Sequence, residues 1–394
     1  MFRLEEMFRG VVHRLRGEET EQQSRPLHVC HVVEQLAVGG IAAGLVPVVN
    51  SLDTDAFLVS CLSLGTRQPL VLEELEPRVQ TWGLSFVPRP RLQGALVELF
   101  RRFQVDVVHT HGAGVLQAVA PAAGIAGVRA VVHTSYGERE PLPPGVTLTA
   151  ASTPAALAMA GANGRDVAGI RVLPRGVDTE RFRPPLDREA LREALGLERA
   201  GLVVGSVSLA AGARVSLAAL VSALRGRGVQ ATGLLVGGAG SGGERARKEG
   251  AKPRRALERS DQHHCQPLLE TGPTRDVASR LAAMDLLVAT GPAGFFAPAS
   301  LLEGMASGLP VVAVVSPGVL DLRGEEGEES GLIVTDGPVE DELERLARDP
   351  DLRRRLGEGA RGFARRRLRP SAVVDAYTAV YRDLGLADGM VASF

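Results

Sequence analysis

The feature of this sequence that most limits its possible folds is an alternation of short apolar runs with helical patterns, which occurs in two series along the chain. Such alternation is typical of βα units built on a parallel sheet. The first series predicts strands near residues 27–33, 56–62, 84–87, 105–110, 130–134, 147–151 and 170–173. The second series predicts strands near residues 202–207, 232–236, 266–269, 286–289, 310–315 and 331–334. The predicted fold class is therefore α/β, with two doubly wound, Rossmann-like domains.

A stretch rich in Pro and Gly separates the two series. Residues 173–184 have no apolar period, and residues 186–197 then resume a helical pattern. A length of 394 residues suits two α/β domains better than one core. We therefore predict an N-terminal domain over 27–184, a C-terminal domain over 185–368, and a last segment over 369–394.

The C-terminal part of the chain has a more helical pattern. Residues 340–348 and 352–367 predict charged helices, and residues 369–386 predict a final amphipathic helix.

The first residues have a different pattern from the rest of the chain. Apolar side chains recur at helical spacing over residues 1–16, with arginines outside that stripe, and a polar run follows to residue 25. Residues 1–26 are therefore interpreted as an amphipathic helix and a linker. The helix is expected to dock on the body or on another subunit, or to make peripheral membrane contact.

Composition excludes several classes of function. The net charge of -1 provides no basic field for nucleic acid, and no apolar run is long enough to span a bilayer. Of the three cysteines, Cys30 and Cys61 lie inside apolar strand-like runs, and no secretory signal is recognised. We therefore expect no nucleic-acid partner and a cytoplasmic location, with the inner face of the membrane as an option.

A paired-glycine loop follows the first predicted strand. Gly39 and Gly40 come at the start of a predicted helix. Glycines let backbone N–H groups approach an anion, and a helix N-terminus adds partial positive charge. The alternative is that the two glycines only form a tight turn.

Two further strands end in polar residues, at 105–112 and 131–137. Loops at the carboxyl ends of strands are where open α/β sheets bind ligands. His109 and His111 alternate on a strand, but no third ligand has suitable spacing, so the sequence predicts no metal site.

A helix predicted near residue 300 carries an acidic residue early in its length. Pro298 suits its first turn, Gly308 its C-terminal end, and Pro310 opens the following strand. The residue is Glu303, with leucines before it. It is interpreted as a ligand-binding carboxylate, or else as a charge that complements the helix dipole by about 0.3–1 kcal/mol.

Four segments together resemble glycosyltransferase family 4 of the GT-B fold: 29–40, 105–137, 170–182 and 281–312. The resemblance implies two Rossmann-like domains that face across a cleft, with the C-terminal helix crossing back to the first domain. It also implies retaining transfer of a sugar from a nucleotide-diphosphate sugar to a glycan or lipid-linked acceptor, in polysaccharide or cell-envelope biosynthesis. Such enzymes need no metal or other cofactor.

The resemblance also assigns donor-site roles to individual residues. The loop of Gly39 and Gly40 would face the donor phosphates and the acceptor, and Glu303 would accept hydrogen bonds from the ribose hydroxyls. Arg214 stands where the family has a phosphate-binding lysine. The segment 170–182 is similar to the interdomain hinge of the family.

Three positions depart from the family pattern. Leu209 replaces the usual arginine, Phe295 replaces the first of two glutamates, and Tyr136 stands where many members have a histidine near the donor sugar. His111, Tyr136 and Phe295 are therefore expected in the cleft, but no catalytic residue is assigned. An inactive homologue that acts as a binding or scaffold partner remains an alternative, because lost charge partners reduce transition-state stabilisation.

Other functional patterns are weaker. The glycines at 238–243 fit a dinucleotide fingerprint, yet no acidic residue follows at a strand end. The run 263–265 has no partner pair at zinc-finger spacing. A nucleotide-sugar epimerase of the same architecture would need more acidic and histidine residues in the cleft.

Overall fold

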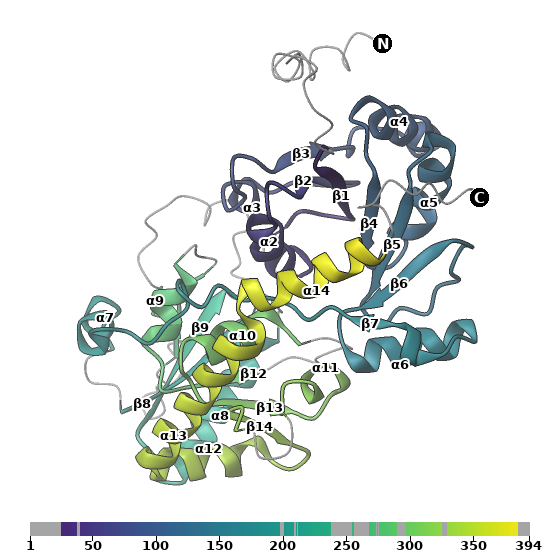
Figure 1. The fold of residues 1–394 in the computed structure, drawn as a ribbon. Coiled ribbons are helices and arrows are strands. Elements are labelled where there is room, and N and C mark those ends of the chain that lie inside the picture. Colours follow the sequence, from purple (N-terminus) through teal and green to yellow (C-terminus); the bar gives the residue numbers. More distant parts are fainter. Residues whose placement is uncertain are drawn as a thin grey trace.

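The protein consists of two lobes, each built around a parallel β-sheet with helices on both faces (Figure 1). The structure is a computed structural model. It describes residues 25–37, 40–197, 201–208, 210, 212–237, 254–255, 268–272, 274, 276–289, 297–324 and 329–384. The amphipathic helix expected at 1–16, the glycine run at 238–243 and the run at 263–265 lie outside these residues.

The N-terminal sheet has seven strands in the order β3-β2-β1-β4-β5-β6-β7, all of them parallel. They are β1 (Leu27–Val33), β2 (Phe57–Ser63), β3 (Gln80–Gly83), β4 (Val107–His111), β5 (Ala130–Ser135), β6 (Val146–Ala150) and β7 (Arg171–Val172). The helices between them are α2 (Ala42–Ser51), α3 (Pro69–Leu72), α4 (Arg89–Arg102), α5 (Val115–Ala126) and α6 (Thr153–Asn163), with a 3₁₀ turn, η2 (Val167–Gly169). The strand order reverses direction between β1 and β4, which is where doubly wound sheets bind ligands.

The C-terminal sheet repeats this arrangement, in the order β10-β11-β9-β8-β12-β13-β14. Its strands are β8 (Leu202–Ser208), β9 (Ala231–Gly237), β10 (Arg254–Arg255), β11 (Leu268–Glu270), β12 (Leu286–Ala289), β13 (Val311–Val314) and β14 (Leu332–Thr335). Its helices are α7 (Arg188–Ala194), α8 (Ala213–Gly226), α9 (Val277–Ala282), α10 (Ala299–Ala306), α11 (Pro317–Leu320), α12 (Val339–Arg348) and α13 (Pro350–Phe363). Only β10 runs antiparallel among the described strands, and it forms an edge.

Most predicted strands agree with the structure within one or two residues, and the first strand agrees at both ends. The prediction near 84–87 was wrong, because β3 lies just before it. Trp82 is the buried anchor of β3 and packs on Phe103, with the ring centroids 4.5 Å apart. Leu84 still donates a backbone hydrogen bond to Ser63, but the following residues turn away from the sheet. A short apolar run alone does not distinguish a strand from the turn that follows it.

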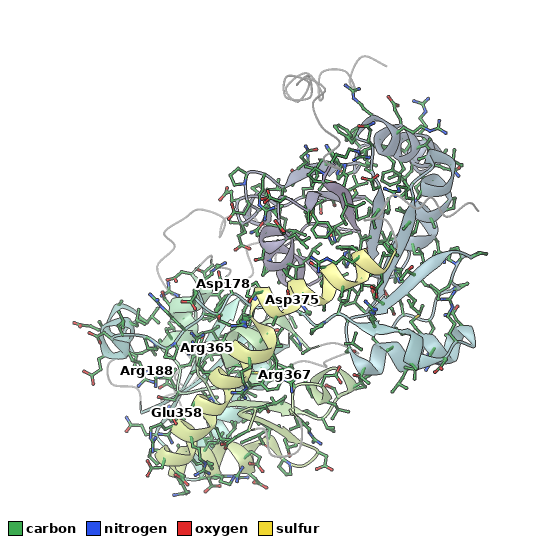
Figure 2. The ribbon with its side chains drawn as sticks, in the orientation of Figure 1. Asp178, Arg188, Glu358, Arg365, Arg367 and Asp375 are labelled. Atoms are coloured by element: carbon green, nitrogen blue, oxygen red, sulfur yellow. The ribbon has the colours of Figure 1, made fainter. Side chains whose placement is uncertain are left out.

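The end of the chain joins the two lobes. The helix predicted over 352–367 is α13 followed by a π-helical turn, η4 (Ala364–Leu368), and α14 (Pro370–Asp383) then crosses to the N-terminal lobe. Figure 2 labels Arg365, Arg367 and Asp375 along this crossing. The Val177 N–H donates to the carbonyl of Leu368 at 2.8 Å, so the hinge and the crossing lie side by side.

The apolar residues on one face of α14 belong to the core of the N-terminal lobe. Val373, Tyr377, Val380 and Tyr381 are buried against α2 and the first two strands. The final helix therefore fixes one lobe relative to the other by hydrophobic burial. Among the described helices, none combines the length and the apolar character needed to cross a membrane.

Candidate functional site

Helix α10 positions Glu303 at the boundary between the lobes. Its N-cap residue is Pro298, and a Cβ at Gly304 would lie 2.4 Å from Cδ2 of Leu287, so the helix packs directly on β12. Leu301 and Leu302 are buried in the core, whereas Glu303 is only partly buried. Gly308 takes φ +75° just after the helix, as expected for a helix end.

The positive charge that acts most strongly on Glu303 is that of Arg175, which the sequence alone did not single out. Arg175 comes from the hinge between the lobes and is 8% exposed. Its guanidinium donates hydrogen bonds to the carbonyl of Gly40 and, at 3.2 Å, to the carbonyl of Ala297. It thus connects the glycine loop of the N-terminal lobe with the segment that enters α10.

Arg175 is held tightly against the N-terminal lobe. A Cβ at Gly44 would lie 2.6 Å from Nε of Arg175. The Arg175 side chain therefore packs on the backbone of α2, and position 44 has no room for a residue larger than glycine. The only sequence signal for this role was a lone arginine in the run Pro174-Arg175-Gly176, which was interpreted as hinge rather than site.

The pKa of Glu303 is set by burial and by the charges of its neighbours. Burial raises the pKa of Glu303 to about 7, the positive charges of Arg175 and Arg181 oppose that rise, and Glu74 adds to it. Burial lowers the pKa of Arg175, which the nearby Tyr136, Glu303 and Tyr377 counteract. An arginine nevertheless stays protonated at neutral pH. The boundary therefore holds one cation next to one carboxyl group that titrates near neutrality.

The other predicted donor-site residues are placed only in part. Gly40 has φ +53°, a conformation that favours glycine, while Gly39 and Phe295 lie outside the described residues. Arg214 is in the first turn of α8 and is 42% exposed, with its Nε 3.9 Å from Oε2 of Glu270. Tyr136 lies just after β5; burial raises the pKa of its phenol, and the positive charge of Arg175 opposes that rise. Arg175 thus bonds to the Gly40 carbonyl and interacts electrostatically with Tyr136 and Glu303.

His111 lies in a buried cluster that the sequence spacing did not predict. His31 from β1, a neighbour of β4 in the sheet, joins His109 and His111, and one nitrogen from each ring lies within 4.8 Å of the others. Tyr381 of α14 closes the cluster, with its hydroxyl 2.7 Å from Nδ1 of His109 and 3.4 Å from Nε2 of His31. Residues far apart in sequence become neighbours only when the parallel strands pair.

The hydrogen bonds of this cluster form one continuous chain. The Thr149 hydroxyl donates to the carbonyl of His133. The Thr149 oxygen therefore accepts from the Thr134 hydroxyl, and the Thr134 oxygen accepts from Nε2 of His109. Nδ1 of His109 therefore accepts from the Tyr381 hydroxyl. This assignment follows from each hydroxyl having one hydrogen.

The same chain continues toward the end of β4. The Tyr381 oxygen accepts from Nε2 of His31, and Nδ1 of His31 then accepts from Nε2 of His111 at 3.0 Å. All three imidazoles are neutral in this pattern. Burial, the largest cause, lowers the pKa of each, in His31 to about 3.

Comparison with known proteins gives a family match in the C-terminal lobe. Residues 198–349 match the family model described as Glycosyl transferases group 1. The lipopolysaccharide core biosynthesis mannosyltransferase LpsB of Rhizobium meliloti (strain 1021) is 30% identical over 198 residues, which are 49% of this chain and 54% of that protein. The chain thus spans about half the length of this relative.

Solved structures share the whole architecture. Anabaena Alr3699/HepE in complex with UDP-glucose has a TM-score of 0.70 at 18% identity, over 91% of this chain and 100% of that one. A glycosyltransferase from Rickettsia africae ESF-5 has a TM-score of 0.69 at 16% identity, over 93% and 100%. At these identities the likeness concerns the fold alone. Taken with the two sheets and the crossing helix, these findings show the two-domain GT-B fold, with a match to the Glycosyl transferases group 1 model over residues 198–349 of the C-terminal lobe.

Proposed function

We propose that this protein transfers a sugar from a nucleotide-diphosphate sugar to a glycan or lipid-linked acceptor, with retention of configuration, in polysaccharide or cell-envelope biosynthesis. The observation that carries the proposal is the place of Glu303, a partly buried carboxyl at the lobe boundary beside Arg175. Two relatives support it: one is a mannosyltransferase of lipopolysaccharide core biosynthesis, and the other is a structure that holds UDP-glucose.

In this proposal Glu303 accepts hydrogen bonds from the ribose hydroxyls of the donor. A carboxylate makes stronger hydrogen bonds than a neutral acceptor does, which favours the ionised form when the nucleotide is bound. The loop of Gly39 and Gly40 and the N-terminus of α10 then face the diphosphate.

Arg175 and Arg214 supply the positive charge that stabilises the leaving diphosphate. Arg175 now donates to two neutral carbonyls, those of Gly40 and Ala297, and a phosphate oxygen is a stronger acceptor than either. Arg214 stands at the carboxyl edge of the other sheet, after β8. Such positive charges act where negative charge grows in the transition state. They therefore replace part of the electrostatic stabilisation that is lost where Leu209 and Phe295 stand in place of charged residues. No metal or cofactor takes part in this scheme at the donor site.

The cellular setting is part of the proposal. A lipid-linked acceptor would bring the enzyme to the cytoplasmic face of a membrane, and the apolar stripe of residues 1–16 is suited to peripheral contact there. The same stripe could instead dock on a protein partner.

A second function, that of an inactive homologue that binds a partner, is favoured by one observation. Arg175 already bonds to carbonyls on both sides of the lobe boundary and is buried there. If these bonds are kept at all times, Arg175 acts as a structural link and leaves less room for a diphosphate.

Calorimetry separates these two functions. Full-length protein is titrated with uridine, guanosine and adenosine diphosphate sugars, and the sugar that binds is then used in a transfer assay. Because hydrogen bonds to a charged group contribute about 1.5–3 kcal/mol, Glu303→Gln should weaken donor binding roughly 10²-fold.

Glu189→Gln, an exposed carboxylate on α7 of the same lobe, is the matched control and should leave donor affinity unchanged. Absence of binding by all three nucleotide classes would refute the transferase proposal and leave the binding partner as the remaining function.

A further inference from the structure

A second cluster of titratable side chains lies at the carboxyl edge of the N-terminal sheet, outside the proposed donor site. It consists of His133 on β5 and of Glu138 and Glu140 in the segment that follows. His133 is fully buried, and the side chain of Glu140 is 12% exposed. Nε2 of His133 and Oε1 of each glutamate lie within 4.8 Å of one another. Each of these three atoms is buried and makes no hydrogen bond to the described protein.

The protonation state of His133 is set by its other nitrogen. Thr110 Oγ1 lies 3.3 Å from the carbonyl oxygen of Val132 and 2.9 Å from Nδ1 of His133. The Thr110 hydroxyl has one hydrogen; we assign it to the Val132 carbonyl, so that Nδ1 of His133 is the donor to Thr110. Nε2 therefore carries a lone pair.

This lone pair meets another acceptor. Nε2 of His133 lies 3.3 Å from Oε1 of Glu140. Two acceptors at this distance repel each other unless a positive species lies between them. Glu138 adds a second negative charge beside the first, and after burial its charge is among the causes that raise the pKa of Glu140.

The outer oxygens of both glutamates are held by protein donors. Oε2 of Glu138 accepts from the hydroxyl of Ser135 at 3.2 Å and from the backbone N–H of Tyr136. Oε2 of Glu140 accepts from the backbone N–H of Gly114 at 3.2 Å. Each of the three side chains thus has one atom fixed from behind and one free atom that points to a common centre. Metal ligands are oriented in this way by the groups around them.

The cluster of His31, His109 and His111 provides the contrast. Its ring nitrogens bond to one another, to Tyr381 and to Thr134 in a chain where donors and acceptors alternate. That chain is complete apart from one terminal nitrogen, Nδ1 of His111, and needs no cation. At the cluster of His133 the free atoms are three acceptors and no donor.

We propose that His133, Glu138 and Glu140 form a binding site for one divalent transition-metal ion, Zn²⁺ or Mn²⁺. One imidazole and two carboxylates suit these ions better than Mg²⁺ or Ca²⁺, which prefer oxygen ligands alone. Two carboxylates also balance the charge of the ion. Three protein ligands leave coordination positions open, as in catalytic zinc sites.

The place of the site indicates what the open positions would take. The site lies where β4 and β5 end, beside Tyr136 and therefore next to the lobe boundary. If the proposed function holds, an acceptor oxygen, from a hydroxyl or a phosphate, would complete the coordination. Binding of the ion itself does not depend on the proposed function.

The test measures metal binding by the full chain without any sugar. Protein treated with EDTA and dialysed is titrated with ZnCl₂ and, separately, with MnCl₂ at neutral pH, by calorimetry. We expect one ion per chain for the metal that binds, and a thermal midpoint that rises with its concentration, because a ligand of the folded state stabilises it.

Glu138→Gln and Glu140→Gln keep the side-chain shape and remove one charge each. Each should weaken metal binding at least tenfold, of the order seen when a metal site loses a supporting group. Glu98→Gln on the exposed face of α4, in the same lobe, is the control and should bind as the unchanged protein does. The thermal midpoints of all variants without metal show whether they fold.

Two results would overturn the proposal. One is that folded, metal-free protein binds neither ion, in which case a proton shared between His133 and Glu140 holds the cluster. The other is that the double variant E138Q/E140Q, still folded, binds the ion as tightly as the unchanged protein. Neither result would bear on donor binding, which the nucleotide-sugar titration measures separately.

Discussion

The two lobes share one sheet topology, yet the carboxyl edges of their sheets are chemically different. In the N-terminal lobe, three histidines and two threonines of the sheet are linked by hydrogen bonds to one another and to Tyr381 of α14. In the C-terminal lobe, the described residues at the corresponding edge present Glu303 and the loose pair of Arg214 with Glu270. Polar groups that satisfy one another hold a lobe together, whereas polar groups left for a ligand weaken the empty protein. Substitutions in the hydrogen-bonded cluster of the first lobe should therefore affect stability, and substitutions at Glu303 or Arg214 should affect donor binding.

Arg175 bonds to carbonyls of both lobes, so replacing it should have the largest effect on the free energy of unfolding. Arg175→Met removes the hydrogen bonds to the carbonyls of Gly40 and Ala297 and the cation beside Glu303. Loss of one member of such a buried polar set costs about 3–5 kcal/mol. The free energy of unfolding is measured by urea denaturation, with Arg183→Met, an exposed arginine of the same interdomain segment, as control. A loss no larger than that of the control would show that Arg175 does not link the lobes.

The second prediction concerns pH. Burial raises the pKa of Glu303 in the folded protein from its ordinary value of 4.5 to about 7. The folded state therefore binds a proton that the unfolded state has released, and stability falls as pH rises from about 4.5 to 7. Glu303→Gln should remove this fall, and above neutral pH it should be more stable by at most about 3 kcal/mol.

Urea denaturation of both proteins across this pH range tests the linkage. The two curves should meet at acidic pH and separate toward neutral pH. Parallel curves would mean that Glu303 is solvated, and the contrast between the edges would lose its main support. A nucleotide sugar that binds the ionised carboxylate should reverse the trend, since its affinity should rise with pH.

A smaller effect on stability is expected at Tyr381, where the chain of hydrogen bonds connects α14 with the sheet. Tyr381→Phe leaves Nδ1 of His109 and Nε2 of His31 without their hydroxyl partner in a fully buried place. An unsatisfied buried group costs about 1–3 kcal/mol. Asp375→Asn on the exposed face of the same helix, labelled in Figure 2, is the control. Equal midpoints for the two variants in thermal unfolding would contradict a structural role for this chain of hydrogen bonds.

The smallest stability effect is expected at Arg214. Its contact with Glu270 is 3.9 Å long and its side chain is 42% exposed, so Arg214→Gln should change the free energy of unfolding by less than about 1 kcal/mol. The same variant should weaken donor binding if Arg214 contacts the diphosphate. Arg225→Gln, in the last turn of α8, is the control for the charge itself. Unchanged donor affinity in Arg214→Gln would restrict the proposed phosphate contact to Arg175.

The sequence by itself determined the architecture. Apolar runs that alternate with helical periods gave both sheets, and the bounds of β1 and β12 agree with the predicted ones at both ends. It also placed Glu303 on a helix, because Pro298 and Gly308 bound that helix with local conformational preferences, although Glu303 lies past the first turn of α10 and not early in it. These features depend on neighbours along the chain, and such preferences can be read without knowing the fold.

The tertiary structure alone decided which residues meet. Arg175 and Glu303 are 128 positions apart in the numbering, and the final helix brings Tyr381 to a histidine on the first strand. His133 and Glu140 are close in sequence, yet their shared centre exists only because Thr110 and Gly114 of the neighbouring strand and loop fix the far side of each group. Burial and partners across a sheet set the charge and the hydrogen-bonding state of these side chains, and no local pattern of residues encodes them.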